Sequence, residues 1–461
     1  MSETKQTSAS GAAVAEDVAL SDVGVRLQAR IEERTASIGV VGLGYVGVPL
    51  AVRAASTGFR VVGFDVLAER VVRISRGESY TVDVPSEKLG PLVASGQLAA
   101  TTDFGRLGEC DVIIICVPTP LDEHGQPDIS YIEQSGTAIA DTLRPGQLIV
   151  LESTTWPGTT DEVLLPKCAA QGLSVGQDFF LAFSPERIDP GQTNSKGWTV
   201  ENTPKVVGGV TTHCTILASA LYGAIVQQIV TVSSARTAEM TKLVENIFRN
   251  VNIALVNELA LLCDRMELNI WEVLDAAATK PFAFMKHTPG PGLGGHCIPL
   301  DPFYLSWKAR EYDFHTRFIE LAGHVNNAMP YHVVTLVTRG LNKLRRSVNG
   351  SIVVALGVAY KPDIDDYRES PIFKIMELLT AEGAQVVPVD PHVATFYDHH
   401  GCAFQTTPLT DELLASADCV LIVTNHSVFD YERIVQLAPV VVDTRNATRD
   451  VREGRDKIVL L

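Results

Sequence analysis

The stretch from Ser37 to Asp65 constrains what this chain can fold into more than any other. Residues 38–41, Ile-Gly-Val-Val, predict a strand, and the glycine-rich turn of residues 42–47 follows it directly. Residues 48–56 have a helical pattern, and residues 60–65 predict a second strand that ends in an acid. A strand, a glycine turn, a helix and a second strand open a doubly wound α/β sheet.

The turn, Gly42-Leu-Gly-Tyr-Val-Gly47, has glycine at the three positions of a dinucleotide fingerprint. Gly42 permits the tight turn, Gly44 lets a pyrophosphate approach the backbone, and Gly47 permits close packing of the helix on the strand. The N–H groups at the start of the helix, beside Tyr45 and Val46, face the phosphates. These residues are the first candidates for binding a cofactor.

Asp65 indicates which dinucleotide is bound. A carboxylate at the end of the second strand accepts hydrogen bonds from the adenosine ribose and repels a 2′-phosphate, so NAD is favoured over NADP. Arg70 is a candidate for contacting the adenine or its ribose, and equally a surface arginine of a helix. Thr119 follows the apolar strand of residues 111–116, at the carboxyl end where such sheets bind ligands.

Two further apolar strands end in polar residues. Residues 147–151 lead into three hydroxyl side chains, among which Thr154 could contact nicotinamide, substrate or a developing oxyanion. Residues 179–183 lead into Ser-Pro-Glu, which places Glu186 at the same edge, where a carboxylate could activate water. Turn capping by the hydroxyls and a solvated turn carboxylate remain the alternatives.

The period becomes helical between residues 235 and 277, in a run long enough to join two domains and to dimerise. Lys242 and Asn246 lie four residues apart, and Asn250 follows at the same spacing, so the three share one face. They indicate a polar site, or else ordinary polar residues of a surface helix. A second helical stretch is expected from about residue 312 to 345, interrupted near Pro330.

Between the two helical stretches lies a loop, Gly290-Pro-Gly-Leu-Gly-Gly-His-Cys-Ile-Pro-Leu-Asp301. Its glycines and prolines allow tight turns close to a ligand. If a short helix starts at Ile298 or Pro299, the N–H groups at its start lower the pKa of the Cys297 thiol and favour a nucleophilic thiolate. A buried structural cysteine in a tight turn is the alternative.

A second alternation of strands and helices fills the C-terminal part. Strands are expected at residues 350–357, 385–390, 419–424 and 440–443, with a helix from Pro371. This predicts a second doubly wound α/β domain. It lacks a glycine fingerprint, so a different nucleotide-like ligand is expected there.

Composition excludes several functions. The net charge is −16, and even the densest basic stretch, residues 339–346, holds only Arg339, Lys343, Arg345 and Arg346. This argues against binding to nucleic acid or an anionic membrane surface. No apolar run predicts a transmembrane helix, and the N-terminus has no secretory signal pattern. Eight cysteines without a CxxC pair indicate a reduced cytosolic protein with mostly inert thiols, and no metal site is expected.

The first 36 residues form an N-terminal extension, expected to be partly disordered. Residues 18–34 predict an amphipathic helix with Leu20, Val23, Leu27 and Ile31 on one face. The pattern does not indicate a role for it.

Taken together, the chain from about Ile38 onward resembles the UDP-glucose/GDP-mannose dehydrogenase family. The resemblance rests on ordered motifs, which are Gly42-x-Gly-x-x-Gly47, Cys116-Val-Pro-Thr-Pro120, Ser184-Pro-Glu186, Lys242-x-x-x-Asn246 and Gly294-Gly-His-Cys-x-Pro-x-Asp301. It implies an NAD-binding domain over residues 37–232, a central helical and dimerisation domain over 233–346, and a UDP-sugar-binding domain over 347–461. The expected fold is α/β, with two doubly wound Rossmann-like domains joined by a helical domain with one long helix.

The resemblance also implies a four-electron oxidation of a sugar C6 alcohol with NAD. Cys297 corresponds to the nucleophile, Lys242 and Asn246 to groups at the oxyanions, and Glu186 to the general base, with Asp301 and Thr154 ordering protons and water. Lys361 and Arg445 correspond to positions that hold the nucleotide sugar, and Arg368 to one that reaches NAD. The substrate-binding set further includes Gly290, Gly292 and Gly294.

The sugar is harder to predict. UDP-glucose enzymes usually carry a second Glu four residues after the Ser-Pro-Glu carboxylate, where this chain has Pro190. That difference resembles the branch acting on UDP-N-acetylhexosamines, with UDP-N-acetylglucosamine first and UDP-N-acetylmannosamine or UDP-glucose as alternatives. A homodimer or higher homo-oligomer is expected. Two other functions remain open, namely a nucleotide-sugar sensor or scaffold and a two-electron hydroxyacid dehydrogenase.

Overall fold

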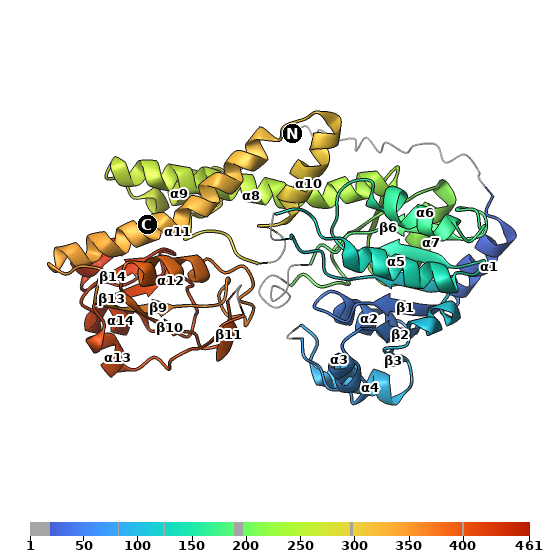
Figure 1. Cartoon of the computed structure of the whole chain (residues 1–461), viewed down its shortest axis with the longest axis horizontal. Coiled ribbons are helices and arrows are strands. Elements are labelled where there is room, and N and C mark those ends of the chain that lie inside the picture. Colours follow the sequence, from blue (N-terminus) through green and yellow to red (C-terminus); the bar gives the residue numbers. More distant parts are fainter. Residues whose placement is uncertain (1–18, 82, 123–124, 189–196, 296–297, 399–400) are drawn as a thin grey trace, which may run out of the picture. The chain divides into compact units, whose positions relative to one another are not determined.

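The computed structural model describes residues 19–81, 83–122, 125–188, 197–295, 298–398 and 401–461. The chain divides into two compact units (Figure 1). Unit 1 comprises Met1–Thr119 and Asp128–Lys242, and unit 2 comprises Pro120–Pro127 and Leu243–Leu461. The division falls inside the long helix α8 (Ala235–Arg265), which contributes residues to both units.

Unit 1 is built on a sheet in the order β3-β2-β1-β4-β5-β6-β7-β8. Neighbouring strands are parallel except for the antiparallel pair β6 and β7. The strands are β1 (Ser37–Val41), β2 (Arg60–Phe64), β3 (Leu98–Thr101), β4 (Val112–Ile115), β5 (Leu148–Leu151), β6 (Phe180–Phe183), β7 (Lys205–Gly209) and β8 (Ile229–Thr231). The order of the first six is that of a doubly wound dinucleotide-binding sheet.

Helices cover both faces of this sheet (Figure 1). They are α1 (Asp22–Glu32), α2 (Gly47–Ser56), α3 (Ala68–Ser75), α4 (Ser86–Ala94), α5 (Ser130–Thr142), α6 (Leu165–Ala169) and α7 (Thr212–Gly223), with the short η1 (Phe104–Glu109) and η2 (Thr160–Leu164). Central strands therefore consist of apolar residues on both sides. Ile114 packs into the cluster that includes α2 and α7, and its neighbours Ile113 and Ile115 pack into the cluster that includes α5.

The N-terminal extension contributes α1, a helix inside the predicted range of residues 18–34. Ser21 caps it, and Leu27 and Ile31 are buried in the core of unit 1. Arg30 at its last turn forms an ion pair with Asp111, which lies just before β4 and also accepts the backbone N–H of Ser37 at 2.8 Å. The helix is therefore tied to the amino ends of β1 and β4, a role that the sequence pattern did not indicate.

Unit 2 contains a parallel sheet in the order β10-β9-β13-β14-β15. Its strands are β9 (Ile352–Leu356), β10 (Gln385–Val389), β13 (Cys419–Ile422), β14 (Val441–Asp443) and β15 (Ile458–Leu460), and β11 (Thr395–Tyr397) with β12 (Ala403–Gln405) forms a separate antiparallel pair. The helices are α9 (Ile270–Ala278), α10 (Asp301–Ala309), α11 (Arg317–Lys343), α12 (Ile372–Ala381), α13 (Asp411–Ser416) and α14 (Tyr431–Leu437), with the short η3 (Arg310–Tyr312) and η4 (Arg455–Lys457).

In unit 2, α11 and α12 cover one face of the sheet, and α13 and α14 cover the other (Figure 1). Alternate residues of β9 follow this division, since Val353 and Ala355 pack toward α11 and α12 while Val354 and Leu356 pack toward α13 and α14. The prediction of two doubly wound α/β sheets and a helical segment with one long helix is confirmed. The four-part division of the chain by residue number stays a prediction.

Two helices differ from the patterns considered in the sequence. The short helix considered at Ile298 or Pro299 is α10, which begins at Asp301 after a turn. The stretch expected to break near Pro330 is the continuous α11. Proline removes one hydrogen bond to the residue four positions earlier, but Pro330 is buried between the fully buried Met329 and Val333, so packing maintains the helix.

Among the residues that the structure describes, no helix is both long and apolar enough to cross a membrane.

Candidate functional site

The glycine turn after β1 has no room for a side chain at its first and last glycines, Gly42 and Gly47, but has free space at Gly44. Gly42 has a φ of +94°, and a Cβ there would lie 2.4 Å from the carbonyl oxygen of Cys116. A Cβ at Gly47 would lie 1.8 Å from the carbonyl oxygen of Gly42, so α2 packs too closely for any side chain. A Cβ at Gly44 would meet no atom within 4 Å apart from its own chain neighbours. This open backbone beside the start of α2 fits a pyrophosphate.

Asp65 is buried at the end of β2 and is fixed by its own chain. It accepts the backbone N–H groups of Leu43 at 2.8 Å and Leu67 at 2.9 Å, and it pairs with Arg70 at 3.2 Å. Tyr80, which no sequence motif marked, donates to the carbonyl oxygen of Leu43 at 2.6 Å and lies under the guanidinium of Arg70. Burial raises the pKa of Tyr80 to about 12, so its hydroxyl stays a donor that supports the turn.

Four other predicted residues lie near this edge of unit 1. Val46 precedes the first residue of α2, and Tyr45 beside it is exposed. Thr119 is buried after β4, and Thr154 is half-buried after β5. They follow parallel strands at the carboxyl ends, and their contact with the cofactor stays a prediction.

A buried lysine lies between two carboxylates at this edge. The ammonium nitrogen of Lys205 is 3.0 Å from an oxygen of Glu186 and 3.1 Å from an oxygen of Glu152. Glu152 follows β5, Glu186 follows β6 and Lys205 begins β7. Their side chains are 0%, 12% and 5% exposed, respectively. Sequence motifs pointed to Glu186 but to neither of its partners, because each of these stands alone beside an apolar strand.

The two carboxyl groups differ in environment. Glu186 also accepts the backbone N–H groups of Arg187 at 2.7 Å and Ile188 at 2.6 Å. Burial opposes its charge, but Lys205 and these donors outweigh burial and hold the pKa of Glu186 below its usual value. Burial raises the pKa of Glu152. The pKa values of two carboxyls on one lysine are therefore shifted in opposite directions.

The polar residues predicted on one face of the long helix form hydrogen bonds to the loop of residues 290–301. In unit 2, Asn246 of α8 donates to Asp301 at 2.5 Å, and Asn250 donates to the carbonyl oxygen of Ile298 at 3.0 Å. Asn257, two turns further along, accepts the backbone N–H of Gly290 at 3.0 Å. Three amides of one helix thus hold the Gly290–Asp301 loop on both sides of Cys297. Lys242, one turn before Asn246, is also buried.

The glycines of this loop are required by side chains of the C-terminal α/β part. A Cβ at Gly290 would lie 2.6 Å from the guanidinium of Arg445. A Cβ at Gly294 would lie 2.5 Å from the Cβ of Tyr360, and at Gly292 the φ of +135° favours glycine. The loop therefore lies against the residues that follow β9 and β14. Cys297 itself lies outside the described residues, and so does its predicted contact with Lys242.

Three further predicted residues lie at the carboxyl edge of the second sheet. Arg445 donates from Nε to the carbonyl oxygen of Val423 at 2.8 Å, and burial lowers its pKa to about 10. The ammonium of Lys361 is buried and lies 5.4 Å from the ring centre of Tyr360. Arg368 forms a two-point ion pair with Asp366 at 2.9 and 2.8 Å. Basic groups at this edge suit a diphosphate.

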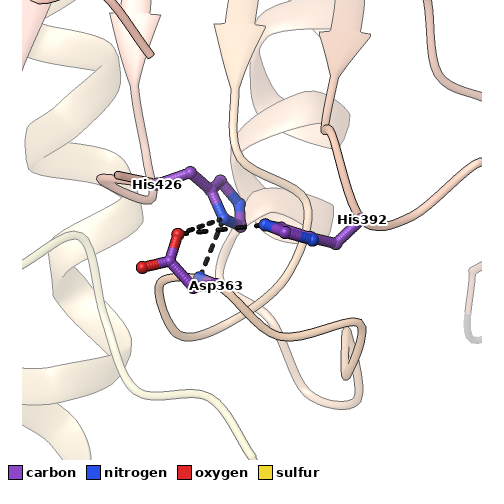
Figure 2. Close-up of side chains that lie close together, drawn as sticks. All are labelled: Asp363, His392 and His426. Atoms are coloured by element: carbon purple, nitrogen blue, oxygen red, sulfur yellow. Dashed lines mark hydrogen bonds and ion pairs between the residues drawn. The ribbon is translucent and has the colours of Figure 1, made fainter. Parts of the chain in front are cut away.

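Figure 2 shows Asp363, His392 and His426, a cluster whose potential ligand atoms lie within 4.8 Å of one another. His426 is fully buried, and its two ring nitrogens are both engaged. Nδ1 lies 3.0 Å from the backbone N–H of Asp363, and Nε2 lies 3.0 Å from Asp390. A metal at Nδ1 would have to displace that N–H, so the cluster is a hydrogen-bonded tie between loops after β9, β10 and β13.

The described cysteines have no disulfide partner, and six of the seven are buried. Burial and the neighbouring Glu152 raise the pKa of Cys116 well above its usual value. Burial also raises the pKa of Cys110 and of Cys168 to about 11. These thiols are protonated and inert at neutral pH.

A dinucleotide-type turn in one doubly wound unit, together with a second doubly wound unit with basic side chains at its carboxyl edge, defines an α/β protein of the dinucleotide-binding class. Comparison with known proteins identifies the family. Residues 36–226 match the NAD binding domain of the UDP-glucose/GDP-mannose dehydrogenase family, residues 236–328 its central domain and residues 354–450 its UDP binding domain. The chain belongs to this family, and it is an NAD-dependent UDP-sugar dehydrogenase.

Similar proteins cover nearly the whole chain. A UDP-N-acetyl-D-mannosamine dehydrogenase of Pyrococcus horikoshii is 35% identical over 90% of this chain and 97% of its own length. A UDP-N-acetyl-D-glucosamine 6-dehydrogenase of Pseudomonas aeruginosa is 35% identical over 85% and 91%. The structure of the UDP-D-ManNAc dehydrogenase from Pyrococcus horikoshii superimposes with a TM-score of 0.83 over 92% of this chain and 98% of that one, at 33% identity.

Proposed function

We propose that this enzyme oxidises the C6 alcohol of UDP-N-acetylglucosamine to a carboxylate, giving UDP-N-acetylglucosaminuronate. The observation that carries the proposal is the set of hydrogen bonds between α8 and the loop that contains Cys297. Asn246, Asn250 and Asn257 bond to loop residues on both sides of the cysteine. A two-electron alcohol dehydrogenase has no need of a positioned thiol. A four-electron oxidation needs one to hold the aldehyde as a covalent adduct.

Bound NAD supplies the hydride acceptor in both oxidations, and the turn from Gly42 to Gly47 with Asp65 is the part of this chain that would hold it. In the first oxidation the C6 alcohol loses a hydride and a proton to become an aldehyde. The Cys297 thiolate then adds to the aldehyde carbon, and loss of a second hydride turns this thiohemiacetal into a thioester. Water cleaves the C–S bond, which gives the carboxylate and returns the thiolate.

The remaining groups have proposed roles around that sulfur. Lys242 and Asn246 stabilise the negative charge that develops on oxygen in each addition step. Glu186 takes up protons, while Asp301 and Thr154 order the attacking water. The hydrogen bond from Asn246 to Asp301 supports this grouping, because it links two of the five residues directly.

The substrate assignment uses a difference in sequence. Pro190 stands where UDP-glucose enzymes usually have a second carboxylate, and it lies outside the described residues. The relatives that act on UDP-N-acetylmannosamine and on UDP-N-acetylglucosamine are equally similar, at 35% identity. UDP-N-acetylmannosamine is therefore the closest competitor.

The test is NADH formation from NAD with five separate substrates: UDP-N-acetylglucosamine, UDP-N-acetylmannosamine, UDP-glucose, UDP-galactose and GDP-mannose. The proposal expects the highest kcat/KM with the first and two NADH per sugar. A ratio of one NADH would remove the thioester step. Binding without any NADH, unaffected by Cys297→Ser, would instead indicate a sensor or scaffold.

A homodimer formed through α8 is part of the proposal. Within unit 2 this helix exposes Val244, Phe248, Leu255, Leu259 and Leu262, spaced three, four or seven residues apart and so on one face. Leu255 is 53% exposed and Leu262 is 50% exposed, which is unusual for a row of large apolar residues. Sedimentation of the Leu255→Glu/Leu262→Glu variant should show monomers, and an unchanged mass would exclude this face.

A further inference from the structure

Glu186 and Glu152, the two carboxyls that contact Lys205, have different hydrogen-bond donors around them. Glu186 faces the Lys205 ammonium and two backbone N–H groups, and none of these three donors can reverse. Glu152 faces the same ammonium, but its other close neighbour is the hydroxyl of Tyr222, which can donate or accept. The sulfur of Cys116 lies 4.0 Å from the second oxygen of Glu152.

Charge balance separates the two carboxyls further. The titratable groups that face the pair are Lys205, Tyr222 and Cys116, drawn from β7, α7 and the end of β4. Burial raises the pKa of both Tyr222 and Cys116 well above their usual values, so neither carries charge at neutral pH. One ammonium can neutralise one carboxylate, and a second buried carboxylate would leave an uncompensated charge.

We propose that Lys205 is a positioning residue that keeps Glu186 ionised and oriented at the edge of the sheet, while Glu152 carries a proton in the resting enzyme. The group is then neutral as a whole, with Glu186 as its anion and the extra proton on the carboxyl of Glu152, beside the hydroxyl of Tyr222. Glu186 keeps 12% of its side chain exposed, so the anion is the member that faces outward.

The inference deepens the proposed function, because it gives Glu186 its charge before substrate arrives. A carboxylate that is ionised across the neutral range is ready to accept a proton. Lys205 opposes protonation of Glu186, so its removal raises the pH at which Glu186 loses its proton. The charge of Lys205 therefore sets the lower pH limit of activity without touching the substrate.

Infrared difference spectroscopy of the full-length protein without substrate tests the charge assignment directly. A band of a protonated carboxylic acid at neutral pH should disappear in Glu152→Gln, which keeps the shape of the side chain. Lys205→Met should add a second such band, and Lys205→Arg should add none. Glu239→Gln is the control for a second buried carboxyl of the same unit, whose pKa burial also raises and which contacts Gly158 and Thr160. It should leave the band assigned to Glu152 in place. No loss of a band in Glu152→Gln would overturn the inference.

The pH dependence of kcat/KM for NADH formation is the second measurement. Lys205→Met should move the acidic limb to higher pH, as far as the neutral range, and kcat/KM at any pH on that limb falls about tenfold for each unit of the shift. Lys205→Arg keeps the positive charge and should leave the limb where it is in the wild type. A purely structural role of Lys205 does not predict that the position of the limb follows the charge.

The two measurements separate the two hypotheses. If the infrared bands behave as expected and the limb stays in place, the charge assignment stands and the role of Glu186 as the base in the proposed function fails. If Lys205→Met does not fold, Lys205→Arg and Glu152→Gln still decide the assignment, since a limb that moves strongly in Lys205→Arg would contradict it.

Discussion

Replacing Asn257 by leucine should loosen the loop that carries Cys297. Asn257 is fully buried on α8, accepts the N–H of Gly290 at 3.0 Å and donates to the side-chain oxygen of Asn326 at 2.9 Å. Leucine is of similar size and makes neither bond. Both Gly290 and Asn326 then lose a hydrogen-bond partner.

The magnitude for the loop is set by Gly290, since the bond to Asn326 joins two helices and is lost whether the loop is open or closed. A buried polar group left without a partner costs about 1–2 kcal/mol, so Asn257→Leu should destabilise the closed loop by about 1–2 kcal/mol. At about 1.4 kcal/mol per tenfold change, the amide hydrogen of Gly290 should exchange roughly 5 to 30 times faster. The rate of NADH formation should fall as well, because the sulfur is held less firmly.

The assay is hydrogen exchange measured by mass spectrometry on peptides that cover residues 286–295. Asn252→Leu is the matched control, since Asn252 lies on the same helix and donates to the carbonyl oxygen of Phe248 within it, at 2.6 Å. If Asn257→Leu and Asn252→Leu change the exchange of this peptide equally, the amides of α8 do not hold the loop.

Three further predictions concern other parts of the fold. Gly47→Ala should prevent unit 1 from folding normally because its Cβ would lie 1.8 Å from a carbonyl oxygen, whereas Gly44→Ala should melt like the wild type and lose the thermal shift produced by NAD. Ile31→Ala, which empties a fully buried site on α1, should cost about 2–4 kcal/mol in denaturant unfolding, while Val25→Ala on its exposed side should cost less than about 0.5 kcal/mol. Burial opposes the charge of Asp390, but His426 and backbone N–H groups outweigh burial and hold its pKa below the usual value. This carboxylate therefore stabilises unit 2 above about pH 4, and the stabilisation is lost as pH falls through the lowered pKa. Asp390→Asn should be less stable at pH 7 and nearly equal to the wild type in acid; a constant difference across that range would refute the assignment.

Local signals predicted the parts of the fold that depend on neighbouring residues. The turn from Gly42 to Gly47 was predictable because the φ of +94° at Gly42 and the contact of Gly47 with the carbonyl oxygen of Gly42 are local demands, although Cys116 also restricts Gly42. Asn246 and Asn250 were predictable as a pair because helical spacing alone puts them on one face. The continuity of α11 through Pro330 was not, since it depends on packing that the local sequence does not contain.

The buried cluster of Lys205 with Glu152 and Glu186 could not be predicted from local sequence patterns either. Glu152 and Lys205 are far apart in sequence and become neighbours only because β5, β6 and β7 are adjacent in the sheet. No spacing rule links them, and an isolated lysine at the start of a strand is usually a surface residue. Knowledge of the strand order, combined with inspection of the polar residues at the ends of each strand, would have found them.

The helix α1 has a practical consequence for anyone who shortens this protein. A cut placed just before β1, at Ser37, would look harmless in a domain comparison because the matched family region starts at residue 36. It would expose the apolar core residues against which Leu27 and Ile31 pack and would remove the ion pair of Asp111 with Arg30. Such a shortened protein should precipitate, while one trimmed only as far as residue 18 should stay in solution.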